Sequence, residues 1–226
     1  MIDNTTPHQS TEYDSNIIKT IPYYENFHIE SIDLIKSYGG KQETWIDIGG
    51  GTGTLIQKAR QSFKDTKFIL CDTSESMIEI AKGKLGNDKN VDFISNCTSQ
   101  DLDKFIHEKV DIITAIQVNH YLNRNNRKKA TQNAFNFLND GGIYITFENI
   151  KPLSETGITT GLNRWGNYQL SHGREKEVVE DHKSRFDTEY FPITILEHLE
   201  LLKNVGFNNS EVFWVSHMQA GFYAIK

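Results

Sequence analysis

The residues best suited to hold a ligand lie in the segment TWIDIGGGTGTL, residues 44–55, where an acid is followed by a cluster of glycines. Asp47 stands near the end of a short apolar run, and glycines occupy positions 49, 50, 51 and 53. Glycine carries a conformational-entropy cost, so such a cluster indicates that something approaches the backbone closely. A glycine-rich turn between a strand and a helix exposes backbone N–H groups to a ligand at the carboxyl end of the strands. The alternative is a tight strand–helix connection that binds no ligand.

Two classes of ligand use such a turn, and the spacing of the glycines separates them. A dinucleotide site has the pattern G-x-G-x-x-G, with the pyrophosphate at the helix N-terminus. This chain has acid-x-G-x-G-x-G from Asp47 to Gly53. The Asp47 carboxylate would repel a pyrophosphate but suits a ligand with an ammonium or sulfonium group. The next apolar run, KFILCD, ends near Asp72, and an acid there can accept both hydroxyls of a ribose in either class of ligand.

These acids and glycines lie at the ends of predicted strands, in a chain that alternates strand and helix. The strands are short, rich in β-branched residues and nearly continuously apolar, which is typical of parallel strands buried on both faces. We predict strands at residues 44–49, 67–72, 91–96, 110–118 and 141–149. We predict helices between them at residues 54–63, 74–85, 100–107 and 126–138. This order predicts a parallel sheet with helices on both faces, whose strand ends meet at one edge.

The N-terminal part of the chain precedes this alternation. Residues 1–40 are expected to form an N-terminal helical cap, with an amphipathic helix that follows Pro22 and ends at Gly39–Gly40. Residues 41–226 would then form the ligand-binding domain.

The C-terminal part contains an insertion and a hairpin. Residues 151–191 interrupt the alternation with glycines, hydroxyl side chains and aromatic residues, and we expect a partly helical lid there. A helix opened by Pro192 and closed by Gly206 should follow. The last two predicted strands, 210–216 and 219–226, are joined by a tight turn and should pair antiparallel.

The motifs WIDIGGGTG and LCDTSESM, with the terminal segment SEVFWVSHMQAGFYAIK, resemble the class I S-adenosylmethionine-dependent methyltransferases of the small-molecule type. The resemblance covers about residues 13–226. It implies a Rossmann-like α/β fold, with a seven-stranded, mostly parallel sheet, an antiparallel C-terminal hairpin and helices on both faces. The terminal hairpin distinguishes this family from nicotinamide dehydrogenases better than the glycines do.

The resemblance also implies a cofactor, S-adenosylmethionine (SAM), with S-adenosylhomocysteine (SAH) as its product. Asp47 and the glycine backbone would hold the methionine amino end, and Asp72 the ribose hydroxyls. The segment SNCTSQ would lie along the adenine, although family members often have an acid where this chain has Cys97. The residues implied to bind SAM are Tyr13, Tyr23, Asp47, Gly49, Gly50, Gly51, Asp72, Thr73, Met77, Cys97, Thr98 and Gln117.

Candidate residues for the methyl acceptor lie on other segments, and each has an alternative role. His120 could act as a general base or could only shape the pocket. Glu148 and Asn149, at the end of the fifth predicted strand, could orient a polar substrate or cap that strand. The aromatic residues of the lid could line the pocket or could pack the lid onto the body. The residues assigned to substrate binding are Tyr24, His120, Tyr121, Glu148, Trp165, Tyr168 and Arg185.

Composition limits the partners and the compartment. The formal net charge of −6 argues against a general nucleic-acid-binding protein. The two cysteines have no metal-ligand spacing, and the histidines are scattered, so we expect no metal site. We expect neither a signal peptide nor a membrane span, because the N-terminus is polar and no apolar run is long enough. These features predict a cytoplasmic monomer or homodimer.

The sequence therefore predicts an enzyme that transfers a methyl group from SAM to an O, N or S atom of a small-molecule acceptor. Methyl transfer needs mainly in-line positioning of the nucleophile, so a dedicated base is optional. The alternatives are a SAM-binding protein with non-methylating chemistry, a tRNA or protein methyltransferase, and a nicotinamide dehydrogenase. The last is disfavoured by the missing G-x-G-x-x-G pattern and by the terminal hairpin.

Overall fold

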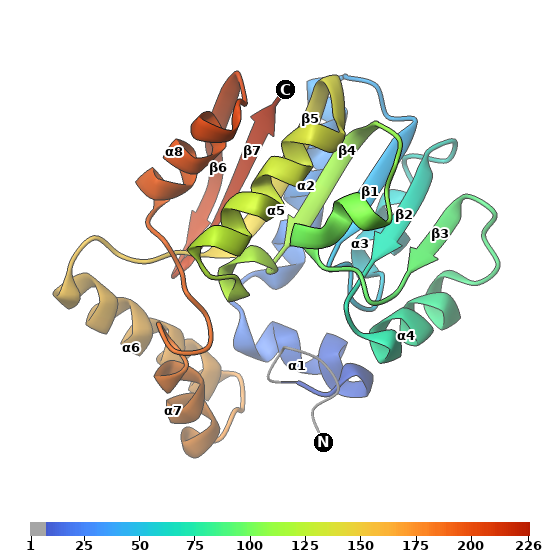
Figure 1. The fold of residues 1–226 in the computed structure, drawn as a ribbon. Helices are drawn as coiled ribbons and strands as arrows, with labels where there is room; N and C mark the ends of the chain where they lie inside the picture. The colour runs from blue at the N-terminus through green and yellow to red at the C-terminus, as the bar shows by residue number, and fades with distance from the viewer. Residues whose placement is uncertain (1–7) are drawn as a thin grey trace.

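A seven-stranded sheet forms the centre of the computed structural model, which describes residues 8–226 (Figure 1). The strand order is β3-β2-β1-β4-β5-β7-β6. Strands β1 to β5 run parallel, whereas β7 pairs antiparallel with both β5 and β6. The strands are β1 (Thr44–Ile48), β2 (Lys67–Cys71), β3 (Val91–Ile94), β4 (Val110–Ile116), β5 (Leu138–Asn149), β6 (Asn209–Ser216) and β7 (Gln219–Ile225). The predicted fold class is confirmed, including the C-terminal hairpin.

Helices cover both faces of this sheet. The helices are α1 (Tyr13–Thr20), α2 (Tyr24–Tyr38), α3 (Thr54–Ala59), α4 (Glu75–Leu85), α5 (Arg124–Phe137), α6 (Glu155–Ser171), α7 (Lys176–Ser184) and α8 (Ile195–Val205). Short 3-10 turns occur at η1 (Ser10–Glu12), η2 (Ser99–Lys104) and η3 (Asn119–Tyr121). Successive strand residues contribute to two separate apolar cores. Trp45 packs with residues of α2, α3 and α4, and Ile46 packs with residues of α5 and α8.

The ends of the helices follow the local sequence. The Ser74 hydroxyl accepts a hydrogen bond from Met77 N and caps α4, and Gly39 ends α2 with a left-handed φ of 70°. The predicted start of α8 at Pro192 is wrong. Thr194 caps that helix through a reciprocal capping box with Glu197, and Gly206 ends it.

Three helices lie together at the carboxyl ends of the parallel strands, at the bottom of Figure 1. We call α1, α6 and α7 the cover. Trp165 Nε1 of α6 donates a hydrogen bond to the Thr20 carbonyl at 2.6 Å, and the Tyr168 hydroxyl donates to the Ile18 carbonyl at 2.8 Å. The segment after β5 and the N-terminal segment therefore form one cover over the edge of the sheet where β1 and β2 end.

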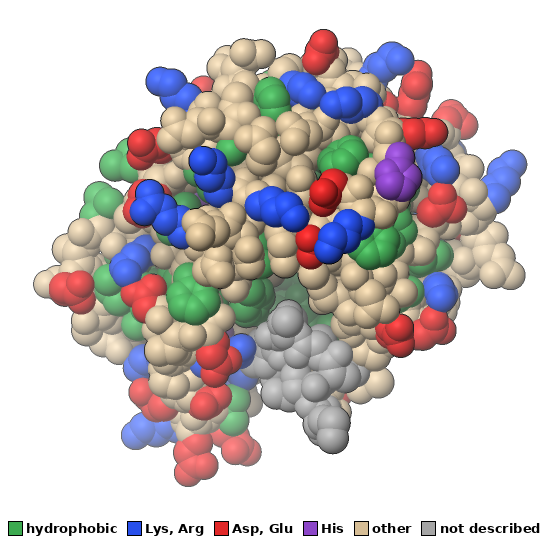
Figure 2. Space-filling model, in the orientation of Figure 1, with side chains coloured by type: hydrophobic (Ala, Val, Ile, Leu, Met, Phe, Trp, Pro, Cys, Tyr) green, Lys and Arg blue, Asp and Glu red, His purple; other side chains and the backbone are tan. Residues whose placement is uncertain are grey.

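Charged side chains of both signs are mixed on the surface. On the face in Figure 2, Lys and Arg lie among Asp and Glu without gathering into one basic patch. Within residues 8–226, no helix has the length and apolar character needed to cross a bilayer.

Candidate cofactor and acceptor site

The glycine turn after β1 forms one wall of a cavity. Its backbone adopts left-handed conformations. Gly49 and Gly51 have φ values of 62° and 53°. A Cβ at Gly49 would meet Val118 Cγ2 at 2.5 Å, so this glycine allows close packing against the segment after β4. A Cβ at Gly51 would meet no atom within 4 Å. The glycine cluster thus serves packing at Gly49 and leaves open space beside the backbone at Gly51.

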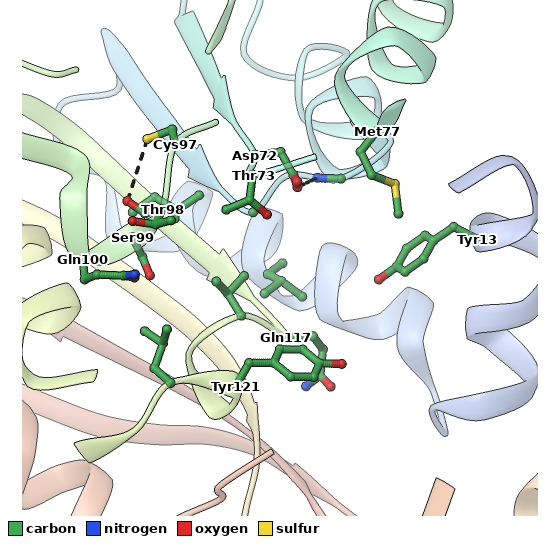
Figure 3. Close-up of a pocket in the computed structure, with 16 residues that line it drawn as sticks. Tyr13, Asp72, Thr73, Met77, Cys97, Thr98, Ser99, Gln100, Gln117 and Tyr121 are labelled. Atoms are coloured by element: carbon green, nitrogen blue, oxygen red, sulfur yellow. Dashed lines mark hydrogen bonds between the residues drawn. The ribbon is translucent and has the colours of Figure 1, made fainter. Parts of the chain in front are cut away.

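A space of about 260 Å³ lies at this edge of the sheet, and we call it the main cavity (Figure 3). Its walls come from α1, the glycine turn, and the segments that follow β2, β3 and β4. The lining residues are Tyr13, Ile48, Gly49, Gly51, Asp72, Thr73, Met77, Cys97, Thr98, Ser99, Gln100, Ile116, Gln117, Val118, Tyr121 and Leu122. Apolar side chains such as Met77 and Ile116 lie beside hydroxyl side chains and the Asp72 carboxylate, and this mixture suits an adenosine.

Asp72 is the acid of the main cavity. Its Oδ2 accepts a hydrogen bond from Gly51 N at 2.9 Å, and its Oδ1 accepts one from Ser74 N at 2.8 Å (Figure 3). Burial raises the pKa of this carboxyl, and these backbone N–H groups counteract the rise. A carboxylate has about four lone-pair sites, and the backbone N–H groups of Ser74, Gly51 and Thr73 do not use all of them, so Asp72 can still accept from a ligand hydroxyl.

A second, smaller space of about 30 Å³ lies on the other side of the glycine turn, and we call it the Asp47 cavity. Asp47 is 2% exposed, and its Oδ1 accepts a hydrogen bond from the Thr114 hydroxyl at 2.7 Å. Burial raises the pKa of Asp47 to about 7, and the charge of Asp72 adds to this rise. A buried acid with no cation beside it favours a ligand that brings a positive charge.

His28 is a residue of this site that the sequence did not indicate. It lies on α2, lines the Asp47 cavity and is 3% exposed, and its Nδ1 has no hydrogen-bond partner in the described chain. Burial lowers the pKa of His28 to about 3, so the ring is neutral. In the sequence, His28 has the pattern of a packed histidine on an amphipathic helix. Only the fold reveals that it faces Asp47.

A polar cluster connects the cover to the glycine turn. Asp14 on α1 accepts hydrogen bonds from the Thr52 hydroxyl at 2.6 Å and from Lys84 Nζ of α4 at 2.6 Å. Lys84 Nζ also donates to Thr54 Oγ1 at 2.7 Å. This cluster holds α1 in place, and with it Tyr13, against the main cavity.

Most of the residues implied to bind SAM line one of these two spaces. Tyr13, Gly49, Gly51, Asp72, Thr73, Met77, Cys97, Thr98 and Gln117 line the main cavity, and Asp47 and Gly50 line the Asp47 cavity. Tyr23 does not. It is 56% exposed and lines a groove on the outer surface, because the turn after Pro22 directs Tyr23 outwards and Tyr24 inwards. Ser99 and Gln100, the last two residues of the predicted adenine segment SNCTSQ, also line the main cavity.

A third space, the inner cavity, lies under the cover and has a volume of about 20 Å³. It shares Tyr13, Gln117 and Tyr121 with the main cavity. Its other residues are His8, Ile17, Thr20, Ile21, Asn149, His182, Arg185 and Tyr190. Of the predicted substrate residues, Tyr121 and Arg185 therefore lie beside the cofactor cavity.

Other predicted substrate residues lie elsewhere. Trp165 is buried in the cover, and Tyr168 lies on the outer groove. Tyr24 lines the Asp47 cavity and the same outer groove. The aromatic residues of α6 thus pack the cover onto the body, which was the alternative role considered for them.

Glu148 and His120 form a buried pair that lies outside the three cavities. The Glu148 carboxylate accepts hydrogen bonds from Asn119 N, His120 N and His120 Nδ1, the last at 2.9 Å. Glu148 lines a small space with Arg127 and His198 on the other face of β5. Adjacent strand residues point to opposite faces, so Asn149, not Glu148, reaches the inner cavity. The pair fixes the turn that carries Gln117 and Tyr121.

Within residues 8–226, no group of three or more His, Cys, Asp or Glu side chains is arranged to hold a metal ion. Cys71 and Cys97 are buried free thiols.

Comparison with known proteins finds similarity to the same family. Residues 46–144 match the sequence model of a family described as "Methyltransferase domain". The carboxy-S-adenosyl-L-methionine synthase of Nautilia profundicola is 25% identical to this chain, over 95% of the chain and 90% of that protein. The synthase of the same name from Staphylococcus epidermidis is 23% identical, over 96% of the chain and 93% of that protein.

Solved structures share the fold at low sequence identity. A putative O-methyltransferase from Nostoc punctiforme matches with a TM-score of 0.69 and 14% identity, over 96% of this chain and 60% of its own. Human N-acetylserotonin methyltransferase in complex with SAM matches with a TM-score of 0.61 and 14% identity, over 96% of this chain and 58% of its own. The resemblance to class I SAM-dependent methyltransferases that the sequence indicated is therefore confirmed.

Proposed function

We propose that this protein binds SAM in the main and Asp47 cavities and transfers its methyl group to an O, N or S atom of a small molecule. The observation that supports this most strongly is the pair of buried acids on either side of one glycine turn. Asp72 faces a nucleoside-sized cavity, and Asp47 faces a small space without a cation. SAM combines the two features that these acids suit, because one molecule carries a ribose and also the positive charges of an ammonium and a sulfonium group.

The residues of the two cavities fit the chemical groups of SAM. Asp72 has lone pairs for the ribose hydroxyls, and Met77 and Cys97 offer apolar surface for adenine. Asp47 would ionise beside the methionine ammonium, and His28 would meet the polar atoms of the same end. Gln117 and Tyr121 line both the main and inner cavities, so they would lie between the cofactor and the acceptor.

The SAM sulfonium supplies an electrophilic methyl group, which moves to a lone pair of the acceptor while the electron pair of the S–C bond stays on sulfur. The protein would contribute position and exclusion of water. The cover closes the inner cavity, and the Glu148–His120 pair fixes the turn that carries Gln117 and Tyr121. Because His120 Nδ1 pairs with Glu148 and the ring lines none of the three cavities, we propose that His120 is not the general base and that the acceptor proton leaves to solvent.

A second candidate function is synthesis of a modified SAM. It is supported by the relatives named carboxy-S-adenosyl-L-methionine synthase, which match nearly the full length of this chain. Such an enzyme would change SAM itself and would leave no methylated acceptor. Mass spectrometry separates the two candidates, since methyl transfer accumulates SAH, whereas the second reaction accumulates a SAM derivative with added carboxylate mass.

The test of the proposed cofactor is a calorimetric titration of SAH into the wild-type protein and into Asp72→Ala. Loss of charge-assisted hydrogen bonds to the ribose should weaken SAH binding by about 30-fold or more. Asp92→Ala on β3 is the matched control, because Asp92 is an exposed acid that pairs only with Lys67 at the surface. Unchanged affinity in folded Asp72→Ala, or no SAH binding by the wild type, would overturn the assignment.

A further inference from the structure

The inner cavity contains polar atoms whose hydrogen-bonding capacity is not used. Within the described chain, the Tyr190 hydroxyl and Gln117 Oε1 are buried and have no hydrogen-bond partner. Tyr190 is 2% exposed, and Gln117 adopts a left-handed φ of 59° that non-glycine residues seldom adopt. Buried polar atoms in folded proteins almost always have partners, so two exceptions on the wall of one cavity point to a ligand.

The same cavity carries positive charge. Arg185 lines it, and the only acid that contacts Arg185 in the described chain is Glu189, which accepts from Nε at 2.6 Å. Glu189 is largely exposed, and the two terminal nitrogens of the guanidinium have no partner among the described residues. Burial and the charges of Arg174 and Arg185 lower the pKa of His182 to about 3, so this neighbour is neutral.

We infer that the inner cavity binds the carboxylate of the methyl acceptor, and that the acceptor is a small carboxylic acid with a hydroxyl or amino group as its nucleophile. The Arg185 guanidinium and the Tyr190 hydroxyl are donors that suit a carboxylate. Gln117 Oε1 is an acceptor that suits the O–H or N–H of the nucleophile. This inference rests on the proposed function, because it names the acceptor of the same site.

The sizes of the cavities agree with this division. A volume of about 20 Å³ admits one group little larger than a water molecule. The carboxylate would occupy this space, and the rest of the acceptor would extend past Tyr121 and Gln117, which also line the main cavity. Burial raises the pKa of Tyr121 to about 12, so its hydroxyl remains a hydrogen-bond donor at this boundary.

The test compares acids with the amides that lack their carboxylate charge, on wild-type protein saturated with SAH. The probes are salicylate and salicylamide, lactate and lactamide, and alanine and alaninamide, with binding measured by ligand-observed NMR. At least one acid should bind about tenfold or more tightly than its amide, because the amide lacks the charge that Arg185 recognises. If no acid binds better than its amide, the inference is wrong, even where SAH binding supports the proposed cofactor.

Variants of Arg185 and Tyr190 then test whether these residues cause the preference for acids over amides. Arg185→Gln should abolish the preference for acids, Arg185→Lys should keep part of it, and Tyr190→Phe should reduce it about threefold. Lys176→Gln is the matched control, because Lys176 is an exposed cation of the same cover, outside the inner cavity. SAH binding by each variant shows that it is folded. A preference for acids that survives in Arg185→Gln, or that disappears in Lys176→Gln, would overturn the assignment.

Discussion

The glycine turn and the cover bound the same site, but they are assembled in different ways. The turn lies within one short stretch of chain, and its contacts with Asp72 cross only from one strand end to the next. The cover joins residues up to 150 positions apart, as in the hydrogen bond from Tyr168 to Ile18. The cofactor side is therefore specified by local backbone geometry, whereas the acceptor side depends on long-range packing.

The largest expected effect distinguishes backbone strain from contact with the ligand. Gly51 and Gly86 both have positive φ, at 53° and 68°, and both have open space where a Cβ would lie. Gly51→Ala should lower the free energy of unfolding by about 1 kcal/mol, and Gly86→Ala should lower it by more, because the Gly86 ψ of −162° lies in a region nearly restricted to glycine. Only Gly51→Ala should also weaken SAH binding, by about tenfold or more, because its methyl group would enter the main cavity. Equal SAH affinities in the two variants would contradict the role given to the turn.

The next effect concerns His28, which belongs to the cofactor side although it lies on α2. His28→Phe should weaken SAH about fivefold through loss of a hydrogen bond, and should leave methylthioadenosine unchanged because that ligand lacks the amino-acid end. His107→Phe, a change at an exposed histidine, is the control. If both ligands weaken together in calorimetry, His28 has a packing role only.

A third effect uses the protonation of Asp47. Burial raises the pKa of Asp47 to about 7, so below pH 7 the carboxyl of the free protein is protonated. The carboxyl releases this proton when the ammonium group of the ligand binds. Affinity for SAH should therefore rise with pH, by about fivefold between about pH 6 and about pH 7. Without ligand, the same shift should lower stability as pH rises from about 4 to about 7. Asp47→Asn should remove both dependences in calorimetry and thermal melts. A pH-independent affinity in the wild type would disprove this role.

The smallest effect on cofactor binding is expected in the cover. Trp165→Phe removes a buried hydrogen bond to the Thr20 carbonyl and should cost about 1 kcal/mol of stability. Tyr168→Phe removes an exposed hydrogen bond and should cost less. Both variants should bind SAH within about twofold of the wild type, since neither residue lines the main cavity. A larger loss of SAH affinity would show that the two sides of the site are coupled.

The difference between the two sides also explains what the sequence could predict. The sequence could predict the site at Asp47, Asp72 and the glycines because these residues lie at or just after the ends of buried strands. Parallel strands bring those ends to one edge of the sheet. Glu148 and Asn149 were both expected to face the substrate, but adjacent strand residues point to opposite faces, and only Asn149 lines the inner cavity. At the turn before α2, Tyr24 and not Tyr23 lines the Asp47 cavity, and the sequence does not distinguish these neighbouring tyrosines. Long-range packing places His28 and Tyr190 at the site, and no spacing of residues in the sequence predicts that packing.

The cluster of Asp14, Thr52, Thr54 and Lys84 has a kinetic consequence. It ties α1 to the glycine turn through an ion pair whose acid is half exposed, and ions in solution screen such a pair. Added salt should therefore loosen α1 and shorten the residence time of bound SAH more than it changes the chemistry of the cavity. If release of SAH limits the rate of the enzyme, the turnover rate would then depend on ionic strength.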